Sequence, residues 1–189
     1  STEVQKGKPD PVVPHFEGEI GLNVDLLQLA HQVFHRTSRI EVGSAVMNIL
    51  CNGGPVAAAE RIAAFCALHG ASPEERRRIC IGFSAGRFDF MNRAHGITPR
   101  DPVEKAAWPA LKGKIFTEAC QIFLRLLKGE ALSSAEIPPT TLARDDFRSG
   151  EDWQRVETAW TSLHGGEVPQ SMEIAPRFSF ERLKIIPQE

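Results

Sequence analysis

The sequence lacks any apolar run long enough to span a bilayer, because its longest apolar stretches carry charged residues within a few positions. The first residues, Ser1-Thr2-Glu3, open a polar, proline-containing stretch and not the basic and apolar segments of a signal peptide. Phosphate-binding loops of the G-x-x-x-x-G-K-[ST] and G-x-G-x-x-G types are also missing. We therefore expect a soluble, cytoplasmic protein with no membrane contact, and the sequence indicates no cofactor.

Cysteine is scarce, and none of the four residues forms a C-x-x-C pair: Cys51, Cys66, Cys80 and Cys120. Each lies in an apolar, helix-like stretch, where a thiol behaves as a small hydrophobic side chain. We expect four free thiols, with a disulfide or a metal site as the alternative.

The length of 189 residues predicts one domain, with room for a small appendage at most. Hydrophobic residues make up 42% and charged residues 24%, which is ordinary for a soluble globular chain. A chain of this length buries about 70% of the surface that it exposes when unfolded. It therefore needs neither a disulfide nor a structural metal to fold.

The net charge of −2 is unevenly distributed along the chain. Residues 1–70 carry a net −2, residues 71–128 a net +5 and residues 129–189 a net −5. We expect the basic middle and the acidic last third to attract each other within one molecule, although the middle could instead face an anionic partner. Nucleic acid is an unlikely partner in spite of the run Arg76-Arg77-Arg78, because the pI is about 6.3 and no nucleic-acid-binding motif is present.

Helical periodicity and capping signals dominate the pattern and predict an all-α fold, a compact bundle of about six helices with extended N- and C-terminal arms. The expected helices cover residues 24–39, 42–50, 55–69, 73–94, 102–128 and a short segment after Ser149. Residues 55–69 are apolar nearly all round, which favours a position in the middle of the core. In the helix after residue 102, Pro109 is expected to kink or split the helix, and Glu118 falls on the polar side opposite the apolar stripe.

The expected organisation has four parts. They are an extended arm over residues 1–23, a helical core over 24–128, a linker over 129–148, and a short helix with an extended arm over 149–189 that packs on the core.

The string Gly82-Phe83-Ser84-Ala85-Gly86 matches G-x-S-x-G, the strand-to-helix turn that presents a nucleophilic serine in many hydrolases. Asp145 or Asp146, followed by His164, would complete the order serine, acid, histidine. We expect Ser84 within a helix instead, because the start signal Ser72-Pro73-Glu74-Glu75 precedes it and no strand–helix alternation builds a sheet. A serine hydrolase that uses Ser84 is therefore the less favoured hypothesis.

Two further groups are candidates for binding. His31 and His35 lie four residues apart on one expected helix face, a spacing that can hold a metal, but nothing nominates a third ligand and solvated histidines are the simpler interpretation. Arg87 falls in an apolar sector of the expected helix 73–94, where it would anchor an anion or form a structural salt bridge.

Trp153 and Trp160 lie seven residues apart on one helix face, which suits core packing or, if the face is free, a binding surface. Because the catalytic patterns are weak and the arms and the charge distribution suit association, we expect a non-catalytic binding or accessory protein: a subunit, adaptor or regulator. Its partner would be another protein or a second copy of the chain. The alternative is a small enzyme, either a serine hydrolase using Ser84 or a metal protein using His31 and His35.

Overall fold

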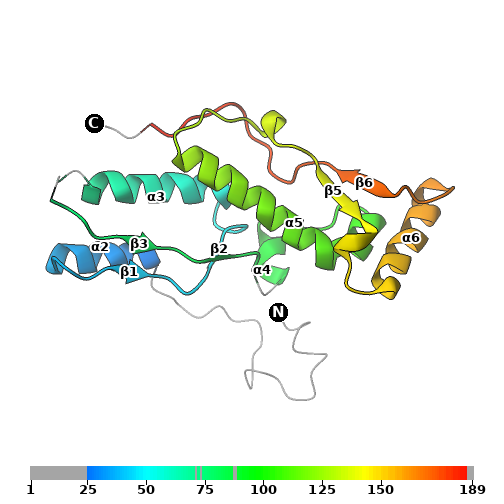
Figure 1. The fold of residues 1–189 in the computed structure, drawn as a ribbon, viewed down its shortest axis with the longest axis horizontal. Coiled ribbons are helices and arrows are strands. Elements are labelled where there is room, and N and C mark those ends of the chain that lie inside the picture. The colour runs from blue at the N-terminus through cyan, green and yellow to red at the C-terminus, as the bar shows by residue number, and fades with distance from the viewer. Residues whose placement is uncertain (1–24, 71, 73, 87–88, 187–189) are drawn as a thin grey trace, which may run out of the picture.

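The structure, a computed structural model, describes residues 25–70, 72, 74–86 and 89–186. The expected N-terminal arm over residues 1–23 lies outside these residues, as does Arg87. Within the described ranges the chain forms five α-helices, shown in Figure 1: α2 (Leu26–Arg36), α3 (Gly54–Gly70), α4 (Asp89–Ala94), α5 (Pro102–Leu127) and α6 (Gly150–His164). No helix among them combines the length and apolar content that crossing a bilayer would take.

Helix α5 is the central element of the fold. Its first turn is fixed as the sequence predicts, because the Asp101 carboxylate caps it by accepting a hydrogen bond from the Glu104 amide at 2.8 Å and Pro102 occupies the first position. Pro109 lies inside the helix without ending it, so the expected split does not occur. Helices α3 and α6 pack against α5, towards its two ends (Figure 1).

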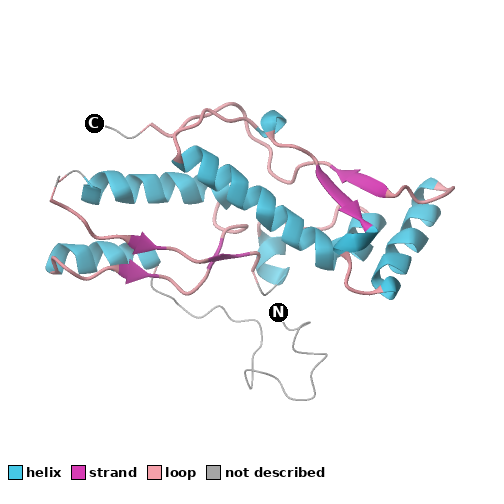
Figure 2. Ribbon diagram, viewed as in Figure 1, coloured by secondary structure: helices cyan, strands magenta, loops and turns pink. Residues whose placement is uncertain are grey.

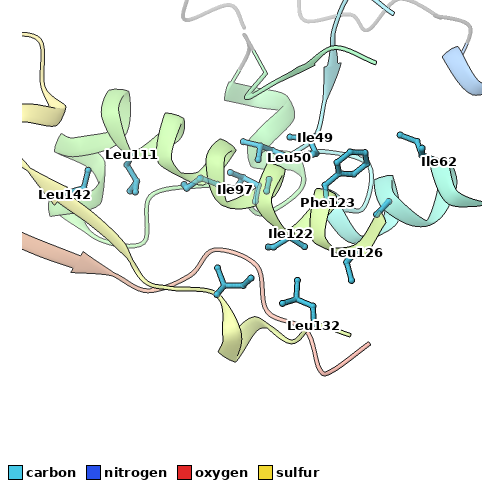
Figure 3. Close-up of a cluster of buried hydrophobic side chains, with 14 of the residues drawn as sticks. Ile49, Leu50, Ile62, Ile97, Leu111, Ile122, Phe123, Leu126, Leu132 and Leu142 are labelled. Atoms are coloured by element: carbon cyan, nitrogen blue, oxygen red, sulfur yellow. The ribbon is translucent and has the colours of Figure 1, made fainter. Parts of the chain in front are cut away.

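A continuous apolar core lies along α5 (Figure 3). Fully buried side chains from α5, from the loop before α3 and from the chain after α5 meet there, and they include Ile49, Leu50, Leu111, Ile115, Ile122, Leu126, Leu132 and Leu142. Burying one such side chain contributes about 1.5–3 kcal/mol. This core holds the described part of the chain together as one unit.

The prediction of an all-α bundle is wrong, because the structure is mixed α/β with short strands in three two-stranded sheets (Figure 2). Two of these sheets are parallel and are formed by β1 (Val42–Gly43) with β3 (Ile79–Cys80) and by β2 (Met47–Asn48) with β4 (Phe83–Ser84). Helix α3 connects the two sides of this ribbon, which is the crossover that a parallel pair requires.

The ribbon replaces two of the expected helices, residues 42–50 and most of residues 73–94; α4 is all that remains of the latter. Close approach of the two segments depends on Gly82, because a Cβ atom there would lie 2.5 Å from the carbonyl oxygen of Ala45. The Met47 amide donates to the Gly82 carbonyl at 2.7 Å, so the ladder continues through this contact. A glycine that weakens a helix is therefore the residue that lets the two segments pair.

The chain after α5 wraps back over the core. Residues 129–148, expected as a linker, contain short 3₁₀ turns at Ser134–Glu136 and Arg144–Asp146 and the strand β5 (Thr140–Ala143), which pairs antiparallel with β6 (Ser171–Ile174). Residues 175–186, here called the C-terminal arm, run along α5 in extended form (Figure 1). A bridge between Leu132 and Leu183 ties the arm to the segment that follows α5.

Candidate protein-binding surface

Ser84 lies at the end of β4, a bend follows at Ala85 and α4 begins at Asp89, so a strand precedes the serine and a helix follows it, as in a nucleophile elbow. This corrects the expectation that Ser84 lies within a helix. Its hydroxyl oxygen is half-buried and accepts a hydrogen bond from the Gly86 amide at 3.2 Å. Among the described residues, no hydrogen bond joins this hydroxyl to a histidine or a carboxylate.

The expected acid and base have other partners. The Asp146 carboxylate pairs with the Lys114 ammonium at 2.6 Å and accepts from the Ala143 amide at 2.9 Å. Burial opposes ionisation there, but the Lys114 contact and the Ala143 amide together outweigh it and hold the pKa of Asp146 below its usual range. The His164 ring lies 4.3 Å from the Trp160 ring on the exposed end of α6. These contacts do not assemble a triad with Ser84.

Two asparagines that the sequence analysis did not single out, Asn48 and Asn92, form a hydrogen-bonded cluster with Cys51 beside the residues that follow Ser84. The Asn48 amide donates to the Asn92 side-chain oxygen at 2.9 Å and to the Cys51 sulfur at 2.8 Å. The Asn92 amide in turn donates to the carbonyl of Ala85 at 3.0 Å. Burial raises the pKa of the Cys51 thiol, so it stays protonated near neutral pH. The cluster holds the backbone at Ala85 in place. Its members lie too far apart in the sequence for a local motif to have predicted it.

His31 and His35 lie beside each other on α2, and a third histidine, His69 of α3, contacts His31. His31 Nδ1 lies 2.9 Å from Nε2 of His69, which comes from α3, and His35 stacks on His31 with ring centroids 5.6 Å apart. Burial, together with the nearby His31 and Arg77, lowers the pKa of His69. The described part of the chain holds no group of three or more histidine, cysteine or acidic residues placed to bind a metal.

The tryptophan face of α6 is turned towards the rest of the molecule. Trp153 is 8% exposed and packs on Phe147 with ring centroids 5.3 Å apart, while Trp160 is half-buried. Helix α6 makes its main contacts with α5. Helix α6 is thus packed on α5, and Trp153 contributes to packing within the molecule.

Within the part of the chain that the structure describes, no segment covers one side of helix α3, although the helix sequence is apolar nearly all round. Ala59, Ile62 and Phe65 are buried, whereas Leu68 is 64% exposed. Across from it, Leu29 of α2 is 48% exposed. The expectation that α3 lies in the middle of the core therefore holds for one side of the helix and fails for the other.

Two grooves flank this side of α3. The first, with a volume of about 710 Å³, lies between α2 and α3, and the second, of about 460 Å³, lies between α3 and the end of the C-terminal arm. Ala64 and Leu68 line both grooves and form a ridge between them. Here we call this the α3 surface, and its solvent-accessible apolar members are Leu29, Ala63, Ala64, Ala67, Leu68, Ile185 and Ile186.

Polar groups border the α3 surface. Arg61 forms an ion pair with the Asp25 carboxylate, which also caps α2 by accepting from the Leu27 amide at 3.0 Å. Glu60 lies at the border of the second groove. An apolar patch of this kind with a polar rim is the usual anatomy of a protein-binding site.

The chain matches no known protein family, and it resembles no curated protein and no solved structure.

Proposed function

We propose that this chain is a non-catalytic accessory protein that binds another polypeptide through the α3 surface. The observation that carries the proposal is the exposure of Leu29, Leu68 and Ile186, at 48%, 64% and 74%, around one continuous pair of grooves. Covering exposed apolar surface of this kind contributes roughly 25 cal/mol for each Å² removed from water. The surface is therefore a source of binding free energy.

The shape of the α3 surface suits the apolar face of an amphipathic helix. Small residues at Ala63, Ala64 and Ala67 let a second helix approach the α3 backbone closely, and the two grooves accept larger side chains on either side. Helices bind such grooves through anchors spaced three and four residues apart. The partner we propose is accordingly a helical segment of another protein, and self-association is the competing outcome.

The described contacts favour binding over catalysis. The hydroxyl of Ser84 has the Gly86 amide as its donor, and the carboxylate of Asp146 is neutralised by Lys114. We propose an intracellular setting, in which the four cysteines remain free thiols as they are in the structure. Fractionation of host cells tests that setting.

The experiment compares Leu68→Glu with a matched control, Leu163→Glu. Leu163 is 46% exposed on α6, outside the α3 surface, so both variants place a carboxylate on an accessible helix position. Chemical cross-linking in extracts of the native host, followed by mass spectrometry, identifies a partner and maps its contact. We expect a cross-link on α3 that Leu68→Glu reduces about tenfold and that Leu163→Glu leaves unchanged.

Light scattering of the purified protein separates the two kinds of partner. A mass of one chain together with a mapped heterologous contact on α3 supports the proposal. A dimer that Leu68→Glu dissociates assigns the α3 surface to self-association instead. A monomer with no cross-linked partner on α3 refutes it.

One observation favours a second candidate, the serine hydrolase: Ser84 ends a strand and precedes a bend and a helix. A fluorophosphonate probe tests it directly. Labelling that Ser84→Ala abolishes would establish an activated serine, and unlabelled protein would remove the candidate.

A further inference from the structure

A second cavity, separate from the α3 surface, lies where α4 meets the beginning of α5. Its volume is about 630 Å³. Three cationic side chains, one acid, two prolines and a tryptophan are among the residues that line it: Arg93, Pro99, Arg100, Asp101, Pro102, Lys105 and Trp108. None of these residues lines the two grooves beside α3.

Arg100 is held in place by backbone groups of the C-terminal arm. Its guanidinium donates to the carbonyl oxygens of Ala175 at 3.1 Å and Pro176 at 2.7 Å. The Glu104 carboxylate lies 4.0 Å away and is also bound by Arg177 at 2.8 Å. The guanidinium is therefore fixed by neutral acceptors, and its charge is only partly balanced.

Lys105 adds a second positive charge to the same wall. It lies one turn into α5, is exposed and forms no ion pair within the described part of the chain. Among the described lining residues Asp101 is the one acid; it caps α5 by accepting from the Glu104 amide and keeps its negative charge, so three cationic side chains stand against one carboxylate. The cavity wall therefore carries an excess of positive charge, which favours an anionic ligand.

Rigid apolar side chains, those of Trp108, Pro99 and Pro102, line another part of the cavity. Trp108 lies three positions after Lys105 on α5 and is half-buried, and the guanidinium carbon of Arg177 lies 6.0 Å from its ring centroid. Pro99 and Pro102 are rigid side chains at the same cavity. An indole face and proline rings contact a planar ligand with little loss of side-chain entropy.

We infer that this cavity binds a small aromatic oxyanion, a carboxylate or phosphate group carried on a flat ring. Arg100 and Lys105 bind the oxyanion, and Trp108 contacts the ring. The N-terminal end of α5 adds a favourable field for the negative charge. This site does not depend on the partner proposed for the α3 surface, since the two share no residue.

The test uses phenyl phosphate as the probe and isothermal titration of the full chain as the readout. We expect a dissociation constant of about 1 mM, as suits a ligand of this size. Phenol, which lacks the oxyanion, and inorganic phosphate, which lacks the ring, should each bind at least about tenfold more weakly. Raising the salt concentration should weaken phenyl phosphate binding, because salt screens exposed charges.

Lys105→Gln is the principal variant and Lys128→Gln its control, because Lys128 is an exposed lysine at the opposite end of α5. We expect Lys105→Gln to weaken binding about fivefold and Lys128→Gln to leave it unchanged. Trp108→Leu should weaken binding about tenfold, with circular dichroism as a check that the variant folds. Absence of measurable binding, or equal affinity in the wild type and in Lys105→Gln, overturns the inference.

Discussion

Replacing Glu118 by alanine tests how the C-terminal arm is held on α5. Glu118 is 4% exposed, and its carboxylate oxygen accepts hydrogen bonds from the backbone amides of Arg177 at 2.8 Å and Phe178 at 3.1 Å. Burial raises the pKa of this carboxyl, although the two amides and the nearby Arg177 and Arg100 oppose the rise. Glu118 thus supplies an acceptor that the buried amides need, at the cost of burying a charge.

The expected loss in the free energy of unfolding follows from these contacts. Glu118→Ala leaves two amides without their acceptor, and a lost bond of this kind costs about 1–3 kcal/mol. We expect a total loss of about 3 kcal/mol in the free energy of unfolding, which is a large fraction of the 5–15 kcal/mol typical of a domain. For a chain of this length that corresponds to a fall in Tm of roughly 6–12 °C.

Glu118→Gln is the matched control, because its side-chain oxygen can accept the same two hydrogen bonds without a buried charge. We expect its free energy of unfolding at neutral pH to lie within about 1 kcal/mol of the wild type. Since folding raises the Glu118 pKa, the folded state holds its proton over a pH range in which the unfolded state has lost it. The contribution of Glu118 to stability therefore falls as pH rises from its usual pKa through the raised one, and Glu118→Gln should remove this slope.

Urea unfolding measures both variants, and hydrogen exchange at residues 177 and 178 reports the amides directly. We expect Glu118→Ala to expose these two amides to exchange before the core opens. The reasoning is refuted if Glu118→Ala unfolds within about 0.5 kcal/mol of the wild type. It is also refuted if Glu118→Gln is as destabilising as Glu118→Ala.

Three further predictions concern other parts of the structure. Gly86→Ala should lower the stability by about 2 kcal/mol more than Gly96→Ala in urea unfolding, because both glycines have φ of +75° but a Cβ at Gly86 would overlap the half-buried amide side chain of Asn48. Arg177→Ala should cost about 3–5 kcal/mol by removing the closer of the two guanidinium groups that face the buried carboxylate of Glu104, and adding Glu104→Gln should recover part of the loss; full additivity in the double variant would contradict this. Because folding lowers the His69 pKa below 6.5, thermal unfolding should show stability falling as pH drops through 6.5, and His69→Gln should flatten that dependence.

The sequence predicts several helices correctly where the signals for them lie within a few residues of one another. Helices expected over 24–39 and 55–69 correspond to α2 and α3, and Ser149 caps α6 as predicted, with its hydroxyl accepting from the Asp152 amide at 3.1 Å. Caps and helical periodicity depend on neighbours within a few positions, so they can be interpreted without the fold.

The failure at residues 73–94 has an identifiable cause. Glu75, which resembles an acid in the first turn of a helix, binds Arg77 instead, and the bonds from Arg77 lower the pKa of Glu75 to about 2. The Arg77 guanidinium donates to the carbonyls of Phe34 at 3.2 Å and Thr37 at 2.5 Å and lies 4.1 Å over the Phe34 ring. The segment is thereby tied in extended form to the C-terminal end of α2. These contacts span about forty positions, which no local signal for a helix can show.

The predictions for Glu118 and Leu68 fail for the same reason: Glu118, expected on the polar side of its helix, is buried, and Leu68, expected in the core, is exposed. The helical period indicates which residues share a face, but it does not show what covers that face. The C-terminal arm covers the polar side of α5 and buries Glu118, whereas no described segment covers the outer side of α3 and Leu68 stays in water. Glu118 is a polar residue in a buried position, and the backbone amides of Arg177 and Phe178 compensate for this by donating hydrogen bonds to its carboxylate. Leu68 is an apolar residue in an exposed position that no described segment covers, and such a position is where a partner is expected.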